Sequence, residues 1–352
     1  MKKTLIIALA AVVALASCTK VEKKEVAKET PMTFKVINYL QQTKANTAYT
    51  GDAFGTFAFW TATNWETDGD ANVYMNNDKI IYGPDYAQGE WGPEDARYWT
   101  KTGCITFASY SPYTTGSDNG FSEIPVFTKE KGFVFNNYTV PINGDVDLMV
   151  ADLIADQSKN NPEYMLSQNT DGVPTLFRHV LSQIAFKFKT NENPNPNVEE
   201  SEIVIKSVTI KNINNEGTYT QNDTDVWSGQ SGSEDYELNP TTSPITVKPG
   251  DDPASTEVEN VILLPQELTD GGQQIEIEYT IRTKYASNDE WVEENITTTV
   301  DLVTPEIPEW DPNESVVYTI TINPVDTSAE NAILFDPAVA EWTAVPTDAF
   351  AL

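Results

Sequence analysis

The residue types that support catalysis or metal binding are scarce in this chain of 352 residues, which has one histidine, His179, and two cysteines, Cys18 and Cys104. His179 lies among apolar residues in LFRHVLSQIAF, a setting typical of a hydrogen-bonded core or edge histidine. A histidine-based triad has no evident base and nucleophile, and a zinc site would have to rely on carboxylates. The sequence therefore predicts no catalytic residue, no metal site and no cofactor.

One acidic stretch, DGDANVYMNNDK, has part of the spacing of a calcium-binding loop. Asp68, Asp70 and Asn72 alternate as such ligands do, but Val73 stands at the turn position and Lys79 at the twelfth. We therefore expect a surface loop. Glycoside hydrolysis by paired carboxylates stays open, because Asp and Glu are numerous and no motif selects a pair.

The first 17 residues have the pattern of a secretory signal peptide. Lys2 and Lys3 precede an apolar stretch at residues 5–15, and the polar run TKVEKKEVAKET follows it closely. That stretch is shorter than the roughly 18–20 residues that a membrane-spanning helix needs. Its LASC ending resembles the lipobox of bacterial lipoproteins, which implies cleavage between Ser17 and Cys18 and acyl chains on Cys18.

The charge of the chain excludes one class of partner. Loss of residues 1–17 leaves 20 basic residues against 53 acidic ones, a formal net charge of −33, and the arginines are Arg97, Arg178 and Arg282 alone. Phosphate binding relies on clustered Lys and Arg, so nucleic acid is excluded as a partner. With Cys18 acylated, Cys104 has no cysteine to pair with, and stability must come from burial.

Strand-like runs dominate the rest of the sequence, separated by Gly, Asn, Asp and Pro. In IEIEYTI, apolar residues at 275, 277, 279 and 281 alternate with polar ones, as an antiparallel sheet with one wet face requires. Short helices are expected only near PEDARYW and NPEYMLSQ. The predicted fold class is all-β, with sheets packed face to face as sandwiches.

Two polar stretches could divide the chain into domains. They are SQNTDGVP at residues 167–174 and TNENPNPNVEES at 190–201. We favour the first, which gives a boundary near residue 172 rather than near 195. The second lies between two runs of matching alternation, IAFKFKT and IVIKSVTIKNI, and reads as a hairpin loop within one domain.

An ordered set of motifs resembles the fimbrillin family, the lipoprotein pilins of Bacteroidales-type bacteria. The set is WGPEDARYWTKTGCITFASYSP, DVDLMVAD, LFRHVLSQIAFKFK, NVILLPQEL, IPEWDPNESVVYTITI and ILFDPAVAEW. The resemblance implies two tandem transthyretin-like β-sandwich domains. It also implies that a protease removes an N-terminal strand, opening a groove for a strand from another subunit. The expected segments are a signal peptide (1–17), a lipidated propeptide (18–44), two sandwiches (45–172 and 173–352) and a terminal donor segment (332–352).

The residues fit that route at both ends of the chain. The removable strand is predicted at Met32, Phe34 and Val36, which share one face and precede the polar stretch QQTKANT. Loss of a strand leaves an unpaired edge that seeks a partner. A terminal segment can fill it by strand addition. Its predicted side chains are Ile333, Phe335, Val339 and Trp342.

The family's maturation cut follows a basic residue, commonly in a Thr-Arg-Ala-like sequence. The matching residues here are Thr43, Lys44 and Ala45, so cleavage is expected between Lys44 and Ala45. Lysine departs from the arginine of the best-known members, which leaves the protease open. Cleavage there would release the lipid with the propeptide, so the anchor would be temporary.

Three function classes remain in view. The favoured one is a structural pilin, in a stalk position, with a role in adhesion. Its expected partners are other pilin subunits, a maturation protease and, through the lipid on Cys18, the outer membrane before processing; the mature form would lie in an extracellular fimbria. The alternatives are a lipid-anchored glycan-binding protein and a secreted hydrolase. Loss of the tail past Trp342 should stop assembly of a pilin but spare ligand binding by a glycan binder.

Overall fold

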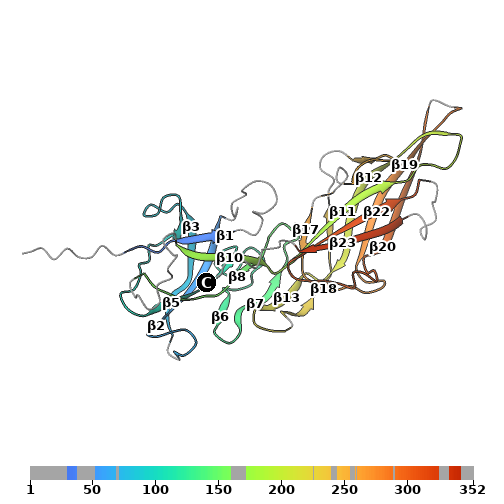
Figure 1. Cartoon of the computed structure of the whole chain (residues 1–352). Coiled ribbons are helices and arrows are strands. Elements are labelled where there is room, and N and C mark those ends of the chain that lie inside the picture. Colours follow the sequence, from blue (N-terminus) through green and yellow to red (C-terminus); the bar gives the residue numbers. More distant parts are fainter. Residues whose placement is uncertain are drawn as a thin grey trace, which may run out of the picture.

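The computed structural model describes residues 30–37, 52–68, 71–159, 172–224, 226–238, 244–253, 258, 260–287, 290–324 and 333–341. Every regular element among these residues is a β-strand, which confirms the all-β prediction (Figure 1). No helix among the described residues has the length and apolar character needed to cross a membrane.

The chain forms 23 strands in the part that the structure describes. In chain order they are β1 (Phe34–Ile37), β2 (Ala53–Thr61), β3 (Asn72–Tyr82), β4 (Trp91–Pro93), β5 (Cys104–Ser111), β6 (Val126–Thr128), β7 (Gly132–Thr139), β8 (Met149–Ala151), β9 (Ile154–Gln157), β10 (Val173–His179), β11 (Ser182–Thr190), β12 (Val198–Ile213), β13 (Glu216–Thr220), β14 (Trp227–Ser231), β15 (Glu234–Leu238), β16 (Ile245–Val247), β17 (Val261–Leu263), β18 (Gln266–Glu267), β19 (Gln274–Tyr285), β20 (Trp291–Asp301), β21 (Glu309–Trp310), β22 (Glu314–Ile322) and β23 (Ile333–Glu341).

The first sheet has eight strands in the order β2-β3-β4-β1-β10-β8-β5-β9. Strand β2 also pairs with β5, so the strands from β2 along this row to β5 form a closed ring of pairings. Its enclosed side chains form a core of their own, which includes Met32, Phe34, Phe54, Phe107 and Phe177. β1 is therefore an interior strand of this sheet, although it comes first among the described strands.

Two further sheets pack face to face in the second half of the chain. One has the order β17-β11-β22-β23, and the other has the order β15-β12-β19-β20, with β16 also paired to β12. Ile275, Ile277 and Tyr279 of β19 are at most 1% exposed, so the face predicted to point inward does so. Inward side chains of both sheets belong to one apolar cluster, as a sandwich requires.

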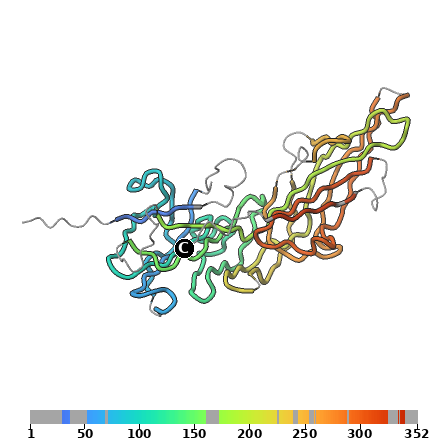
Figure 2. Tube along the Cα trace, viewed as in Figure 1, coloured from blue at the N-terminus to red at the C-terminus, as the bar shows by residue number. Residues whose placement is uncertain are grey.

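A fourth sheet, β14-β13-β7-β6, combines strands from both halves of the chain, and β18 and β21 form a separate pair. Figure 2 shows the two groups of sheets lying end to end along the molecule. Strand β10 follows residue 172 but pairs with β1 and β8 in the first sheet. The division into domains at residue 172 stays a prediction.

Two local predictions are wrong. The stretch PEDARYW contains no helix: it bends at Glu94 and Asp95, after which Met32 N donates to Arg97 O at 2.7 Å and Trp99 N donates to Thr30 O at 3.0 Å. Pairing with residues 30–32 thus replaces the expected helix. The stretch 190–201 is no hairpin loop, because β11 and β12 lie in different sheets and pack their apolar faces against each other. The other expected helix, NPEYMLSQ, lies outside the described residues.

A buried hydroxyl in the second half provides a test of this core. The indole of Trp310 donates to the hydroxyl of Tyr318 at 3.0 Å, which donates to the Leu302 carbonyl at 3.2 Å. Tyr318→Phe would leave two buried polar groups without a partner, so we expect the free energy of unfolding to fall by roughly 1–3 kcal/mol.

Chemical denaturation measures this change. The matched control is Tyr82→Phe, because Tyr82 is 61% exposed and loses only a solvated hydroxyl. We expect the control to change the free energy by less than about 0.5 kcal/mol. Equal losses in the two variants would show that the Trp310–Tyr318–Leu302 chain contributes nothing specific.

Candidate functional site

Strand β1 is hydrogen-bonded on both sides. It runs parallel to β10, with Phe34 opposite Val173, and it meets β4 in the antiparallel sense at Trp91. Val173 N also donates to Thr33 O at 2.8 Å. Together with the bonds to Arg97 and Trp99, these contacts place residues 30–37 in a slot between residues 91–99 and β10.

The floor of this slot is aromatic. Met32 is fully buried and Phe34 is 2% exposed. The ring of Phe34 lies edge-on to Phe54 and to Phe107, each with ring centroids 5.7 Å apart. Val36 packs against the same core, whereas Lys35 points to solvent. Burial of Met32 and Phe34 contributes about 3–6 kcal/mol gross, at roughly 1.5–3 kcal/mol per side chain.

Gly172 forms one wall of the slot. Its φ is +107°, a backbone conformation that favours glycine. A Cβ atom at this position would lie 3.0 Å from backbone atoms of Phe34 and Thr33. The sequence pattern treated Gly172 only as part of a polar connection, so this close approach was not predicted.

The terminal strand β23 lies at a sheet edge. It pairs antiparallel with β22 over its whole length, from Glu341 opposite Glu314 to Ile333 opposite Ile322. No further described strand follows β23 in its sheet. Leu334 is 62% and Val339 is 46% exposed. The terminal apolar run therefore pairs within its own chain but leaves apolar side chains in solvent.

Several predicted site residues lie outside the described residues. They are Ser17, Cys18, Lys44, Ala45 and Trp342. Of the other donor residues, Ile333, Phe335 and Val339 all belong to β23. The Lys44–Ala45 bond falls in sequence between the end of β1 and the start of β2.

His179 and Cys104, the residue types most often used in catalysis, are both held in the core by hydrogen bonds. His179 is 4% exposed, and its Nδ1 lies 2.9 Å from Asp147 Oδ1, so the prediction of a hydrogen-bonded core histidine is confirmed. Cys104 is buried; its Sγ lies 2.7 Å from Thr63 O and 3.1 Å from Asp156 Oδ1, and either oxygen can accept its one S–H bond. Burial raises the pKa of Cys104 to about 11, which keeps the thiol protonated and unreactive near neutral pH.

The ionic groups also have partners within the chain. Arg97 pairs with Asp78 at 2.6 Å, Arg178 pairs with Asp152 at 2.7 Å, and Arg282 pairs with Glu202 and Glu293. Asp68 accepts a bond from the Ala62 amide at 2.8 Å, so its carboxylate supports a turn. Among the described residues, no group of three or more His, Cys, Asp or Glu side chains is placed to hold a metal ion.

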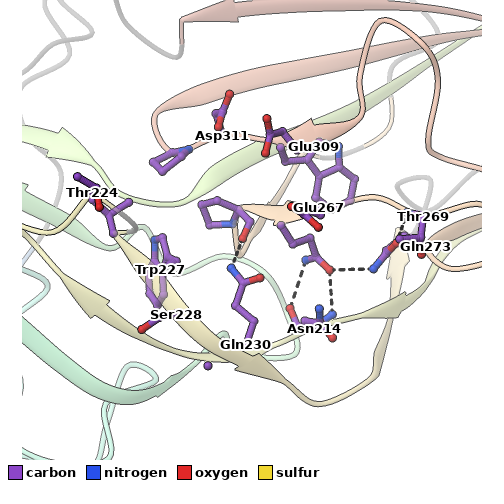
Figure 3. A pocket seen from close by; sticks show the side chains of 16 residues that line it. Asn214, Thr224, Trp227, Ser228, Gln230, Glu267, Thr269, Gln273, Glu309 and Asp311 are labelled. Atoms are coloured by element: carbon purple, nitrogen blue, oxygen red, sulfur yellow. Dashed lines mark hydrogen bonds between the residues drawn. The ribbon is translucent and has the colours of Figure 1, made fainter.

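A polar cleft of about 790 Å³ lies between β14, β18 and β21. Figure 3 shows the carboxylates of Asp311 and Glu309 on one wall and the side chains of Gln230 and Asn214 on the other. Glu309 lies directly opposite Glu267 in the β18–β21 pair. The sequence pattern did not predict this cleft, because its lining comes from separate short strands.

The cleft presents no open aromatic platform. Its two indoles, Trp227 and Trp310, are 5% and 1% exposed. The buried side-chain amide of Gln266 accepts from Asn214 N at 3.1 Å and donates to Leu264 O at 3.1 Å. The polar atoms at the floor of the cleft therefore have hydrogen-bond partners within the chain. The arrangement holds loops together and offers no exposed aromatic surface on which a sugar could stack.

A sequence model of the fimbrillin-like family matches residues 43–342. The chain belongs to this family. Membership confirms the resemblance of the motifs and supports a role as a fimbrial component at the cell surface.

One solved structure supports the fold. A fimbrial protein from Bacteroides vulgatus is 22% identical, with 89% of this chain and 99% of that chain covered and a TM-score of 0.67. Two candidate cell adhesion proteins, from Bacteroides uniformis and Bacteroides ovatus, are 17% and 16% identical, each with a TM-score of 0.48; 89% and 90% of this chain and 99% of each of those chains are covered. The comparison with curated proteins finds no significant match.

The state of Cys104 can be measured directly. In a Cys18→Ser chain, which has Cys104 as its one cysteine, we expect no maleimide labelling of the folded protein at pH 8 and complete labelling in denaturant. With a pKa of about 11, only about one thiol in a thousand is ionised at that pH. Rapid labelling of the folded chain would contradict the buried position of the thiol.

Proposed function

We propose that this fimbrillin-like protein is a structural subunit of a cell-surface fimbria, exported as a lipoprotein, cut after Lys44 and joined to its neighbours by strand exchange. One observation supports this above all. β1 is an interior strand of its sheet, yet it precedes the predicted cut and would be separated from the rest of the chain by it.

Cleavage after Lys44 changes how β1 is held. β2 keeps its place through β3 and β5, whereas β1 loses its covalent link and keeps only its backbone bonds and its buried side chains. Its departure would expose the amides and carbonyls that face it and an aromatic pocket formed by Phe54 and Phe107. Such an edge pairs readily with another strand.

β23 is suited to fill that slot in another subunit. It is an edge strand, so it can leave its own sheet with the loss of one ladder of backbone bonds. Strand addition draws affinity from those backbone bonds and specificity from alternate side chains. If five apolar side chains of the terminal segment become buried, the gross gain is about 8–15 kcal/mol, an upper bound before ordering costs.

The geometry of the two ends favours a fibre. β1 lies in the first group of sheets and β23 in the second, and the two groups lie end to end (Figure 1). A subunit that accepts a strand at one end and donates one from the other makes a head-to-tail contact, which extends into a fibre unless its rotation closes a ring. The lipid on Cys18 would tether the precursor to the outer membrane until cleavage releases the stalk subunit.

The cleavage position can be tested on the cell surface. Protein sheared from wild-type cells should begin at Ala45. A Lys44→Ala chain should stay lipidated at Cys18 and form no fibres, because β1 remains linked to β2. Lys28→Ala, upstream in the same propeptide, is the control and should mature normally. A blocked N-terminus at Cys18 in wild-type fibres would overturn the proposed maturation.

The donor role can be tested with the tail. A chain truncated after residue 332 should fold with β1 in its slot and, once cut after Lys44, should fail to polymerise, because it can accept a strand and cannot donate one. A peptide of residues 331–345 should bind it, and a Phe335→Ser peptide should bind at least tenfold more weakly. Leu334→Ser is the matched control, because residue 334 lies on the opposite face of an extended strand. Calorimetry measures both, and a truncated chain that still forms fibres would exclude β23 as the donor.

A further inference from the structure

We call residues 30–179 the first half of the molecule and residues 182–341 the second half. The connection between them is short and buried. β10 ends at His179 and β11 begins at Ser182, and the intervening Val180 and Leu181 are 5% and 0% exposed. Val180 N donates to Leu148 O at 3.1 Å, and the indole of Trp227 donates to Val180 O at 2.6 Å. Boundaries between independent domains usually fall in exposed linkers, and this one does not.

A hairpin, residues 216–231, crosses from the second half to the first; we call it the clasp. In sequence it lies between β12 and β15, which both belong to the second half. Its strand β13 nevertheless pairs antiparallel with β7, with Glu216 opposite Thr139 and Thr220 opposite Val134. Val140 N donates to Asn215 O at 2.7 Å just beyond the ladder.

Aromatic side chains reinforce this pairing. Tyr219 and Trp227 of the clasp are each 5% exposed. The ring of Tyr219 stacks on Phe135 of β7 with centroids 5.2 Å apart, and Trp227 lies 6.0 Å from Tyr138. Such pairs contribute about 0.5–1.5 kcal/mol each beyond their burial. The clasp is thus fastened by backbone bonds and by rings from both halves.

A third contact lies on the other side of the connection. Ile262 N, in β17, donates to Gly144 O at 2.8 Å. The φ of Gly144 is +57°, and an added Cβ would run into the side chain of Val261. One apolar cluster runs through all three contacts, with Phe57 and Phe135 from the first half and Ile184 from the second.

We infer that the clasp joins the two halves into one cooperative unit, so that the subunit is a rod without a hinge. This inference goes beyond the proposed function, because it holds for a single chain whether or not that chain polymerises. If the subunit does accept a strand in one half and donate one from the other, tension along the fibre is shared between the covalent connection at Val180 and Leu181 and the clasp.

Calorimetry of the purified, unprocessed chain tests the inference. The wild type should unfold in one transition whose calorimetric and van't Hoff enthalpies agree. Trp227→Ala removes the indole that bonds Val180 and packs on Tyr138, so the transition should split in two, with the lower one reduced by roughly 5–15 °C. The control is Phe186→Ala, a buried ring of the second half, which should lower a single transition without splitting it. Two transitions in the wild type, or equal behaviour of the two variants, would overturn the inference.

A disulfide across the clasp keeps the test decisive if Trp227→Ala folds poorly. Val134 and Thr220 are directly opposite in the β7–β13 ladder. In a Cys18→Ser chain with both positions changed to cysteine, oxidation should raise the whole transition, and in the Trp227→Ala background it should restore a single one. If oxidation raises only part of the transition, the halves are not coupled through the clasp.

Discussion

The burial of β1 is the constraint on which the rest of the structure depends. Met32 and Phe34 fill the centre of an aromatic core, and the backbone of residues 30–37 forms hydrogen bonds with segments on both sides. Any form of the protein without this segment must cover the same slot, because unpaired buried amides and open rings are costly in water. A strand in this slot is therefore required at every stage, whichever chain supplies it.

The two terminal strands differ in how firmly they are held. β1 is interior and its inward side chains are almost fully covered, whereas β23 lies at an edge with Leu334 and Val339 in solvent. β23 gives up one ladder of backbone bonds when it leaves its own sheet, whereas a strand that enters an empty β1 slot can pair on both sides. In the proposed exchange, this asymmetry would set the direction, and cleavage rather than spontaneous opening would be the controlling step.

Local pattern predicted the strands well and their partners poorly. Alternation at Ile275 and Ile277 identified a half-buried strand, because the pleat alone dictates which side chains face inward. Pairing is a non-local property, so the separation of β11 from β12 and the crossing of the clasp were not visible. The helix expected at PEDARYW failed for the same reason, since residues 30–32 supply its backbone partners. At the site, the apolar face of Met32 and Phe34 was readable, but the role of Gly172 depends on a contact distant in sequence.

The negative net charge of the chain opposes association between subunits, which makes the β1 slot more important for assembly. With a formal net charge of −31 for the whole chain, two copies repel each other at distances within the Debye length of about 8 Å at physiological salt. The arginines are engaged with carboxylates of their own chain, so they are poorly placed to offset that repulsion. Attraction between subunits must then come from short-range burial and backbone pairing. In the proposed assembly, β1 would block the slot before cleavage, and charge repulsion would disfavour association of the precursors until the slot opens.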